Sequence, residues 1–536
     1  MAIARRPSDR RLAVAIAAVA VVVVAAPIVA ALIRALDAGY VVNGDQAIIA
    51  ARASDVFTSR FPLVGGFSTV TYLVHERAYH PGPLLFWLLA VPARVHWSGA
   101  LPAFMAAVNA ASAAGVLLLA RRRGGDGLML ATAAALVLTF GSLRTDVIRD
   151  VWNPSAAVVP FTLLIYLCWS LACGELKLLP LAVLVASFTM HCHVAYVTPS
   201  SLLLATGLVG LVLARRSGGG EPRSGRRWWI AAGVVALLCW SGPLIERDNL
   251  GTLADAAGAR DEALGSVAAL RAVERALGVS PWWLHRAQSP LSRVADVVTG
   301  PPVATWATAV ALLLALSVLL GIAARRRRAD VVAACAVALA LCVALYVLTA
   351  AYPKSPEQLA SYGYTSWWAA PAGMFAWLTA GWSAVTLFVH RHAPRGALLT
   401  AGVLVAMAAA VFVIVDRQGR NADEQWYQPV RTVLGRVHDE LPSTHSVRVD
   451  GAFALELQAA IIYDLRRRGL EVSAPADVAV QLSPEYFSYH RPFDWVVDVS
   501  PGAVPPDFAR PIARVTVGRP TYKTFTVSLR RIRRQV

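Results

Sequence analysis

Long apolar runs separated by short polar stretches dominate the chain. The first run extends from Leu12 to about Leu36, and further runs recur until about residue 415. About 20 apolar residues in a helix cross the ~30 Å hydrocarbon core of a bilayer, so the pattern predicts a mainly α-helical polytopic membrane protein with about eleven transmembrane helices. The predicted spans are 12–36, 100–120, 128–143, 155–173, 177–192, 198–214, 229–245, 302–323, 330–351, 366–389 and 397–415.

Composition supports this class. Hydrophobic residues make up 57% of the 536 residues and charged residues only 15%, with a mean hydropathy of +0.54. These values lie well outside the range of soluble globular proteins. The net charge of +17 comes almost wholly from arginines at the ends of apolar runs, a pattern that anchors a membrane topology and requires no nucleic-acid partner. The six cysteines lie in or beside apolar runs and are interpreted as small buried hydrophobes.

Arginine positions set the predicted orientation, because cytoplasmic loops retain Arg and Lys. A cytoplasmic N-terminus places the major inter-span clusters on the cytoplasmic side: Arg121–Arg123, Lys177, Arg215 with Arg216 and Arg223–Arg227, Arg325–Arg328, and Arg391 with Arg395. This orientation requires that the segment 84–95 forms a juxtamembrane or re-entrant helix, which its short length, Pro92 and Arg94 favour. If the segment crosses the membrane, the orientation of all later spans reverses. A signal peptide is the alternative for the basic N-terminus, but the run is long and more spans follow, so we predict an uncleaved first helix.

The same topology places the polar loops 40–83 and 246–301 on the extracytoplasmic side, together with the tail. Loop 246–301 is predicted to be helical in part. In the tail we predict a helix at 423–441, the strand SVRVDG, an amphipathic helix stopped by Gly469, and strands at 494–499 and 513–517. The expected division is a membrane domain, 1–415, with a catalytic loop at 40–83, and a small extracytoplasmic α/β domain, 416–536.

Loop 40–83 concentrates groups that could perform chemistry. Its ionisable side chains include Asp45, Asp55, Glu76, Arg52, Arg60, Arg77, His75 and His80. Asp45 follows the first apolar run so closely that its carboxylate is expected near the bilayer surface. A second outer loop, SLRTDVIRDVWNPS, adds Asp146, Arg149 and Asp150.

A first helix, an outer loop that opens with Gly44-Asp45, and a His-Pro-x-Pro-Leu element at 80–84 leading into an apolar Trp-containing segment resemble the GT-C superfamily of polyprenyl-phosphate-sugar-dependent transferases. The resemblance is greatest to bacterial relatives of protein O-mannosyltransferases and of the lipid A aminoarabinose transferase. It covers the layout of the membrane part and, at motif level, only the stretch 44–84.

This resemblance implies an inverting transfer of a sugar from a polyprenyl-phosphate donor to an extracytoplasmic glycan, lipid or protein hydroxyl, with a lipid phosphate as leaving group. Asp45 matches the family's general base by position and by its preceding glycine. Partial desolvation near the interface raises the pKa of such a carboxyl toward the useful range. The alternative is that Asp45 caps a helix beginning at Gln46. Asp150 is the candidate accessory acid, with Asp146 as the alternative; a solvated interfacial loop is the competing interpretation.

A lipid-phosphate leaving group needs cationic or hydrogen-bonding neighbours. The candidate substrate-binding residues are Arg52, Arg60, Arg77, His80, Arg149, His193, Lys354 and Tyr362, the last two from a segment rich in aromatic residues that could stack on sugar or prenyl groups. A basic residue at a helix end is often only an anchor, and His80 could serve only a proline-fixed turn. His191 and His193 point to different faces of a helix, so no metal site is predicted, and a divalent-ion requirement is left open.

The sequence contains no Walker loop, no dinucleotide fingerprint after a strand, no zinc-type cysteine spacing and no HExxH motif. These absences disfavour a cytoplasmic nucleotide-sugar enzyme and favour a lipid-linked donor. A flippase of lipid-linked glycan is the main alternative, and it predicts ionisable residues in mid-span and matching halves, neither of which is visible. A non-catalytic membrane scaffold is the third interpretation.

Overall fold

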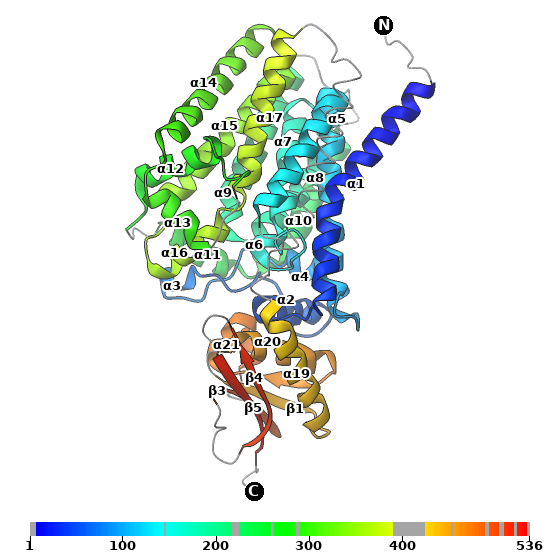
Figure 1. The fold of residues 1–536 in the computed structure, drawn as a ribbon, viewed down its shortest axis with the longest axis vertical. Helices are drawn as coiled ribbons and strands as arrows, with labels where there is room; N and C mark the ends of the chain where they lie inside the picture. The colour runs from blue at the N-terminus through cyan, green and yellow to red at the C-terminus, as the bar shows by residue number, and fades with distance from the viewer. Residues whose placement is uncertain are drawn as a thin grey trace.

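The computed structural model describes residues 7–143, 146–216, 225–258, 262–285, 290–389, 424–451, 454–487, 493–502, 509–518 and 523–532. Within these residues, a bundle of long helices adjoins a smaller domain built around a β-sheet (Figure 1). Seven helices in the described part are long and apolar enough to cross a membrane. The fold class predicted from the apolar pattern is therefore confirmed.

The apolar runs become helices because a helix pairs every backbone polar group within its own segment, as a bilayer requires. The helix α7 (Val158–Ala172) is buried along its whole length and forms the centre of the bundle. The predicted span 397–415 lies outside the described residues. The bundle helices are α1 (Pro7–Asp37), α5 (Ala100–Ser142), α7 (Val158–Ala172), α8 (Leu179–Cys192), α9 (Val197–Arg216), α10 (Arg226–Ile245), α14 (Val303–Arg325), α15 (Ala329–Ala350) and α17 (Ala369–Phe388).

The 43-residue α5 contains two of the predicted spans. Its backbone leaves helical geometry at Gly125, where φ is +73°, a conformation that a residue without a side chain adopts readily. Gly99, just before α5, lies against Leu36 at the end of α1, and Asp146, just after α5, lines a cavity with Asp45. Both ends of α5 therefore lie at the same end of the bundle.

The segment 84–95 does not cross the bundle. It forms the six-residue helix α4 (Leu84–Leu89) followed by the 3-10 turn η2 (Pro92–Arg94). Six residues rise only about 9 Å in a helix, far less than a hydrocarbon core. The expected short helix is confirmed, and Arg94 ties it to α2 (Gly44–Ser54) by donating to the Ser54 carbonyl over 2.6 Å.

Short elements gather at the end of the bundle that faces the sheet domain (Figure 1). Loop 246–301 is helical in part, as expected. The short elements are α2 (Gly44–Ser54), η1 (Asp55–Phe57), α3 (Thr71–Val74), α6 (Asn153–Ala156), η3 (Leu176–Leu178), η4 (Val194–Tyr196), α11 (Arg247–Gly258), α12 (Gly265–Leu277), α13 (Pro290–Val298) and α16 (Pro356–Thr365). Of these, η1, η3 and η4 have no label in Figure 1, and α12 lies about midway along the bundle; the placement refers to the other labelled elements.

The sheet domain has a five-stranded mixed sheet in the order β2-β1-β3-β5-β4. β1 pairs in parallel with β2 and β3, whereas β5 is antiparallel to both of its neighbours. The elements are α19 (Glu424–Glu440), β1 (Ser446–Gly451), α20 (Leu455–Arg467), β2 (Glu471–Ser473), α21 (Ala476–Leu482), η5 (Pro484–Tyr486), β3 (Trp495–Pro501), β4 (Arg510–Val517) and β5 (Lys523–Arg531).

The predicted tail helices and strands are present, and Gly469 has the positive φ of +81° expected just past a helix end. The inner strand β5 was not predicted, although Phe525, Val527 and Leu529 alternate with polar residues as a strand requires. The predicted domain boundary near residue 415 lies outside the described residues and stays a prediction.

One buried carboxylate joins the sheet domain to the bundle. Asp55, directly after α2, is fully buried and accepts hydrogen bonds from Arg52 at 3.1 Å, from Arg466 at 2.9 Å and from the Tyr486 hydroxyl at 2.8 Å. Arg466 and Tyr486 belong to the sheet domain. The start of α1 lies at the opposite end of the bundle from this junction (Figure 1).

Candidate active site

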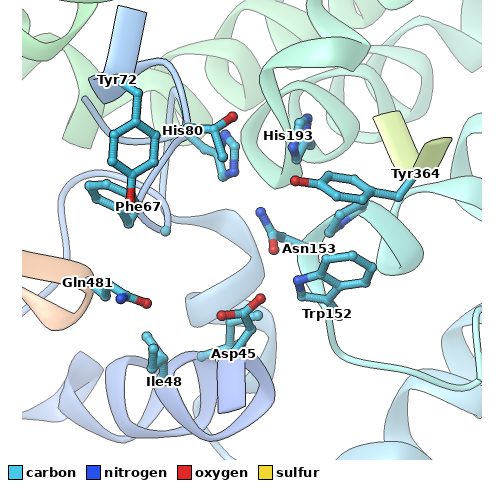
Figure 2. Close-up of a pocket in the computed structure, with 14 residues that line it drawn as sticks. Asp45, Ile48, Phe67, Tyr72, His80, Trp152, Asn153, His193, Tyr364 and Gln481 are labelled. Carbon is cyan, nitrogen blue, oxygen red and sulfur yellow. The ribbon is translucent and has the colours of Figure 1, made fainter. Parts of the chain in front are cut away.

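A cavity of about 210 Å³ lies where the bundle meets the sheet domain, and we call it the first cavity. Figure 2 shows side chains surrounding its open space, with the Asp45 carboxylate on one side and His80, His193 and Tyr364 on the other. The residues come from α2, the loop before α4, the segment around α6, the ends of α8 and α16, and α21. Its lining consists of Asp45, Ile48, Ile49, Gly66, Phe67, Thr69, Tyr72, His80, Trp152, Asn153, Pro154, His193, Tyr364 and Gln481.

Asp45 occupies the first turn of α2. The helix begins at Gly44, whose φ is +51°, and its N-cap residue is Asn43, which makes no side-chain capping bond. The alternative that Asp45 caps a helix beginning at Gln46 is therefore wrong. Every other residue of α2 is buried, whereas the Asp45 side chain is open to cavity space.

A second cavity, of about 250 Å³, lies on the other side of Asp45. Asp45 and Trp152 line both cavities and so form part of the wall between them. Asp146 and Asp150 both line the second cavity, so the structure brings both candidates for the accessory acid to this site. The lining consists of Asn43, Gly44, Asp45, Gln46, Asp146, Asp150, Trp152, Leu455 and Glu456.

The loop that carries the two accessory candidates is held by one internal hydrogen bond and by two from other segments. Asn109 of α5 donates to the Ile148 carbonyl over 2.9 Å. The backbone N–H of Trp152 donates to Asp150 over 3.2 Å, and the Tyr196 hydroxyl donates to the Pro154 carbonyl over 3.2 Å. These bonds fix the position of Trp152 beside Asp45.

The surroundings of Asp45 raise the pKa of its carboxyl. The largest cause is desolvation, because protein atoms surround the carboxyl even though it opens on the cavities. A hydrogen bond from the Trp152 side chain lowers the pKa, and the nearby Glu456 carboxylate raises it further. A carboxylate of raised pKa is a better proton acceptor at neutral pH.

His80 and His193 form a pair with ring centroids 4.3 Å apart. The backbone N–H of Val194 donates to His80 Nδ1 over 3.4 Å, and that of Ala195 donates to His193 Nδ1 over 3.2 Å. Neutral rings that accept at Nδ1 carry their proton on Nε2. Burial lowers the pKa of His193 to about 3, and burial together with His193 holds the pKa of His80 well below its usual value. Both rings are neutral donors at neutral pH.

A close approach of two loop segments positions His80. Its N–H donates to the Gly66 carbonyl over 2.8 Å, and its carbonyl accepts from the Gly65 N–H over 3.0 Å. A Cβ at Gly65 would lie 2.8 Å from the His80 Cβ, so only glycine fits there.

An aromatic wall completes the first cavity. Trp152 packs on Tyr364 with centroids 4.8 Å apart, and on Trp367 at 5.8 Å. The predicted substrate residue Tyr362 is fully buried in the core, where its hydroxyl pairs with Thr349 at 3.1 Å. Residues two apart on a helix differ by about 200° in direction, so the same helix turns Tyr364 toward the cavity.

The predicted cationic residues lie elsewhere. Arg52 is bonded to Asp55, and the buried Arg60 lies over the Tyr486 ring with its guanidinium carbon 4.5 Å from the centroid. Both therefore belong to the junction with the sheet domain. Neither lines the first or the second cavity.

Arg77 and Lys354 are exposed, and Arg77 lies over Phe487 at 4.9 Å. Arg149 is buried, donates to the Tyr427 hydroxyl over 3.4 Å, and has a pKa raised above its usual value because Tyr427 and Asp150 outweigh the opposing effect of burial. Among the described residues, no Arg or Lys lines either cavity. The substrate-binding role of these cations stays a prediction.

The described residues contain no group of three or more His, Cys, Asp or Glu side chains arranged to hold a metal ion. His191 packs against Trp240, with centroids 4.8 Å apart, and against Gly82, whereas His193 faces His80. The two histidines thus point to different neighbours.

Two polar cavity residues that belong to the sheet domain were not predicted from the sequence. Gln481 lines the first cavity and Glu456 the second, and both lie more than 400 positions from Asp45 in the sequence. No local pattern relates them to Asp45. Tyr364 and Trp152, by contrast, stand within segments that the sequence already marked as aromatic or polar.

No family model matches the sequence, and no curated protein matches it. Among solved structures, the chain is similar to that of ArnT from Cupriavidus metallidurans bound to undecaprenyl phosphate, with a TM-score of 0.52. The sequences are 12% identical, and the match covers 95% of this chain and 97% of the other. This likeness shows the fold alone: nearly the whole chain has the architecture of that ArnT chain. The resemblance expected from residues 44–84 is confirmed at that level.

Proposed function

We propose that the chain is a membrane glycosyltransferase that moves a sugar from a polyprenyl-phosphate donor to a hydroxyl of an extracytoplasmic glycan, lipid or protein. The observation that carries this proposal is the position of Asp45 on the wall shared by two cavities, in a fold shared with a protein solved with undecaprenyl phosphate bound. A transfer reaction needs two substrates to meet at one base, and two adjoining cavities supply that arrangement.

In the proposed reaction, the acceptor oxygen attacks the anomeric carbon while the bond from that carbon to the phosphate oxygen breaks. The configuration inverts. Asp45 takes the proton of the acceptor hydroxyl, and the polyprenyl phosphate leaves with the bonding electrons. The raised pKa of Asp45 supports this role, since a general base works best with a pKa near the operating pH.

We assign the donor to the first cavity. The Trp152 and Tyr364 rings offer apolar faces to a sugar, and the Nε2–H groups of His80 and His193 offer neutral hydrogen bonds to a phosphate that gains charge as it leaves. The acceptor then occupies the second cavity, where Asp150 or Asp146 orients its hydroxyl. Arg52, Arg60, Arg77, Arg149 and Lys354 remain candidates for holding the phosphate.

The base is tested with Asp45→Asn in the full chain, purified and reconstituted in lipid nanodiscs. Transfer is followed from radiolabelled undecaprenyl-phosphate sugars to a cell-envelope fraction, while binding of undecaprenyl phosphate is measured separately. We expect transfer to fall about 10²–10⁴-fold while lipid binding is kept. Asp477→Asn, which removes an exposed acid of the sheet domain, is the control. Wild-type transfer by the Asp45→Asn protein refutes the proposal.

The orientation is tested on its own. All six native cysteines are buried or partly buried, so a cysteine introduced at exposed Asp477 reports the side of the sheet domain. We expect an impermeant maleimide to label Asp477→Cys in intact cells. Labelling only after lysis places the domain in the cytoplasm and contradicts an extracytoplasmic acceptor.

A further inference from the structure

The sheet domain contributes a carboxylate to the wall around Asp45. Glu456 lies in the first turn of α20 and lines the second cavity together with Gly44 and Asp45. A Cβ at Gly44 would lie 3.5 Å from the Glu456 Cγ, so the two segments are in contact next to the base. Two carboxylates from different domains therefore line one cavity.

The far end of α20 is anchored, which fixes where Glu456 lies. Arg466 donates to the buried Asp55 over 2.9 Å, and the Tyr463 hydroxyl donates to the Ala93 carbonyl over 2.6 Å. Both acceptors belong to the bundle. The helix that carries Glu456 is thus held against α2 by bonds that an undocked sheet domain would lose.

Other ionisable side chains also face Asp45 across the two cavities. His80, His193, Tyr72 and Tyr364 face it across the first cavity, and both imidazoles are neutral at neutral pH. Across the second cavity, the loop before α6 presents Asp146 and Asp150, with Arg149 buried behind them. Glu456 is the carboxylate that the sheet domain adds to this set.

We propose that Glu456 is a positioning residue whose negative charge, delivered by the docked sheet domain, drives proton uptake by Asp45. The inference rests on the proposed function, in which Asp45 removes the acceptor proton. Like charges that line one cavity repel, and protonation of Asp45 relieves that repulsion. The direction agrees with the raised pKa of Asp45, to which Glu456 contributes after burial.

The sign of the effect follows directly. Glu456→Gln removes the like charge, so the pKa of Asp45 falls and the carboxylate persists to lower pH. The acidic limb of the transfer rate then shifts to lower pH, and the plateau rate decreases because a weaker base accepts the proton less readily. Glu456→Asp keeps the charge, so the acidic limb of its pH–rate profile should lie close to that of the wild type.

A first experiment is independent of transfer. Full-length protein in nanodiscs is treated with a water-soluble carbodiimide and an amine across a pH series, and modification of Asp45 is quantified by peptide mass spectrometry. Carbodiimides react with the protonated carboxyl, so the midpoint reports its titration. We expect a lower midpoint in Glu456→Gln and no change in Asp477→Asn, which removes a first-turn acid of α21 in the same domain. An unchanged midpoint in Glu456→Gln overturns the inference.

A second experiment measures the pH–rate profile of transfer in the same variants. A labelling shift accompanied by full activity in Asp45→Asn refutes the proposed function and leaves the link between Glu456 and Asp45 intact. If Asp45→Asn loses activity but Glu456→Gln shifts neither the labelling curve nor the pH–rate profile, the role of Glu456 is refuted and the proposed function stands. Thermal unfolding of each variant confirms folding, and if the Gln variant is unstable, Glu456→Ala, which also removes the charge, carries the comparison.

Discussion

The carboxylate of Asp55 should contribute far more stability than a surface acid, because it balances two arginines at the domain junction. It is fully buried, and the side chains of Arg52 and Arg466 are 7% and 14% exposed. Asp55→Ala leaves both guanidiniums without this partner. Removing one member of a buried ion pair typically costs about 3–5 kcal/mol. We therefore expect docking of the sheet domain to weaken by about that amount.

Hydrogen–deuterium exchange measures this loss locally. Peptides covering α2 and α21 with η5 report opening of the junction, and exchange in the rapid-reclosing regime follows the opening free energy. About 3–5 kcal/mol corresponds to roughly 10²–10³·⁵-fold faster exchange. The sheet β3–β5, away from the junction, should keep its protection because its own backbone pairing is unchanged.

A double-mutant cycle separates pairing from simple loss of packing. The cycle combines Asp55→Ala with Arg466→Ala, and contacting charges should give a coupling energy well above the ~0.5 kcal/mol within which independent sites add. Asp477→Asn, at an exposed position of the same domain, should change protection by no more than about 0.5 kcal/mol. If Asp55→Ala exchanges like the wild type at the junction, the carboxylate does not hold the domains together, and the reasoning is refuted.

Two further predictions concern the base and the bundle. Trp152→Phe removes a hydrogen bond that lowers the pKa of Asp45, so that pKa should rise and the acidic limb of the pH–rate profile should move to higher pH, opposite to Glu456→Gln; a shift to lower pH contradicts the assignment. Gly373→Ala should destabilise by about 1–3 kcal/mol in thermal unfolding, because its Cβ would lie 2.3 Å from the Ala276 carbonyl of another helix. Gly381 lies on the same helix, and a Cβ added there would meet no atom within 4 Å, so Gly381→Ala should leave the free energy of unfolding unchanged or increase it. Equal effects of the two changes would show that the contact of Gly373 with Ala276 is not the cause.

Local pattern was sufficient to predict most elements of this fold. Apolar length predicted the bundle helices, because a bilayer admits only segments that satisfy their own backbone. The short length of 84–95 and its Pro92 predicted that this segment does not cross the membrane, and the helix there has only six residues. The strand β5 was missed, although its alternation was readable at 523–531.

Site residues could be predicted only where the reactive side chain stands in a segment with a recognisable local pattern. Asp45, His80 and His193 were selected from the sequence, and all three line the first cavity. Tyr362 was selected in place of Tyr364, because which face of a short helix meets a cavity depends on its packing. The arginine assignments show the same limit, since a charge beside a site and a charge within a domain junction look alike in a polar loop.

Local sequence was enough to predict that this chain crosses a membrane many times, that a carboxylate follows the first crossing, and that an α/β tail follows the last. These properties depend on neighbours in the chain, through hydrophobic length, periodicity and turn residues. Only the packing of distant segments places Asp45 between two cavities and brings Gln481 to the first and Glu456 to the second. Contacts between residues more than 400 positions apart depend on how α2 and α20 pack, and no local pattern encodes that packing.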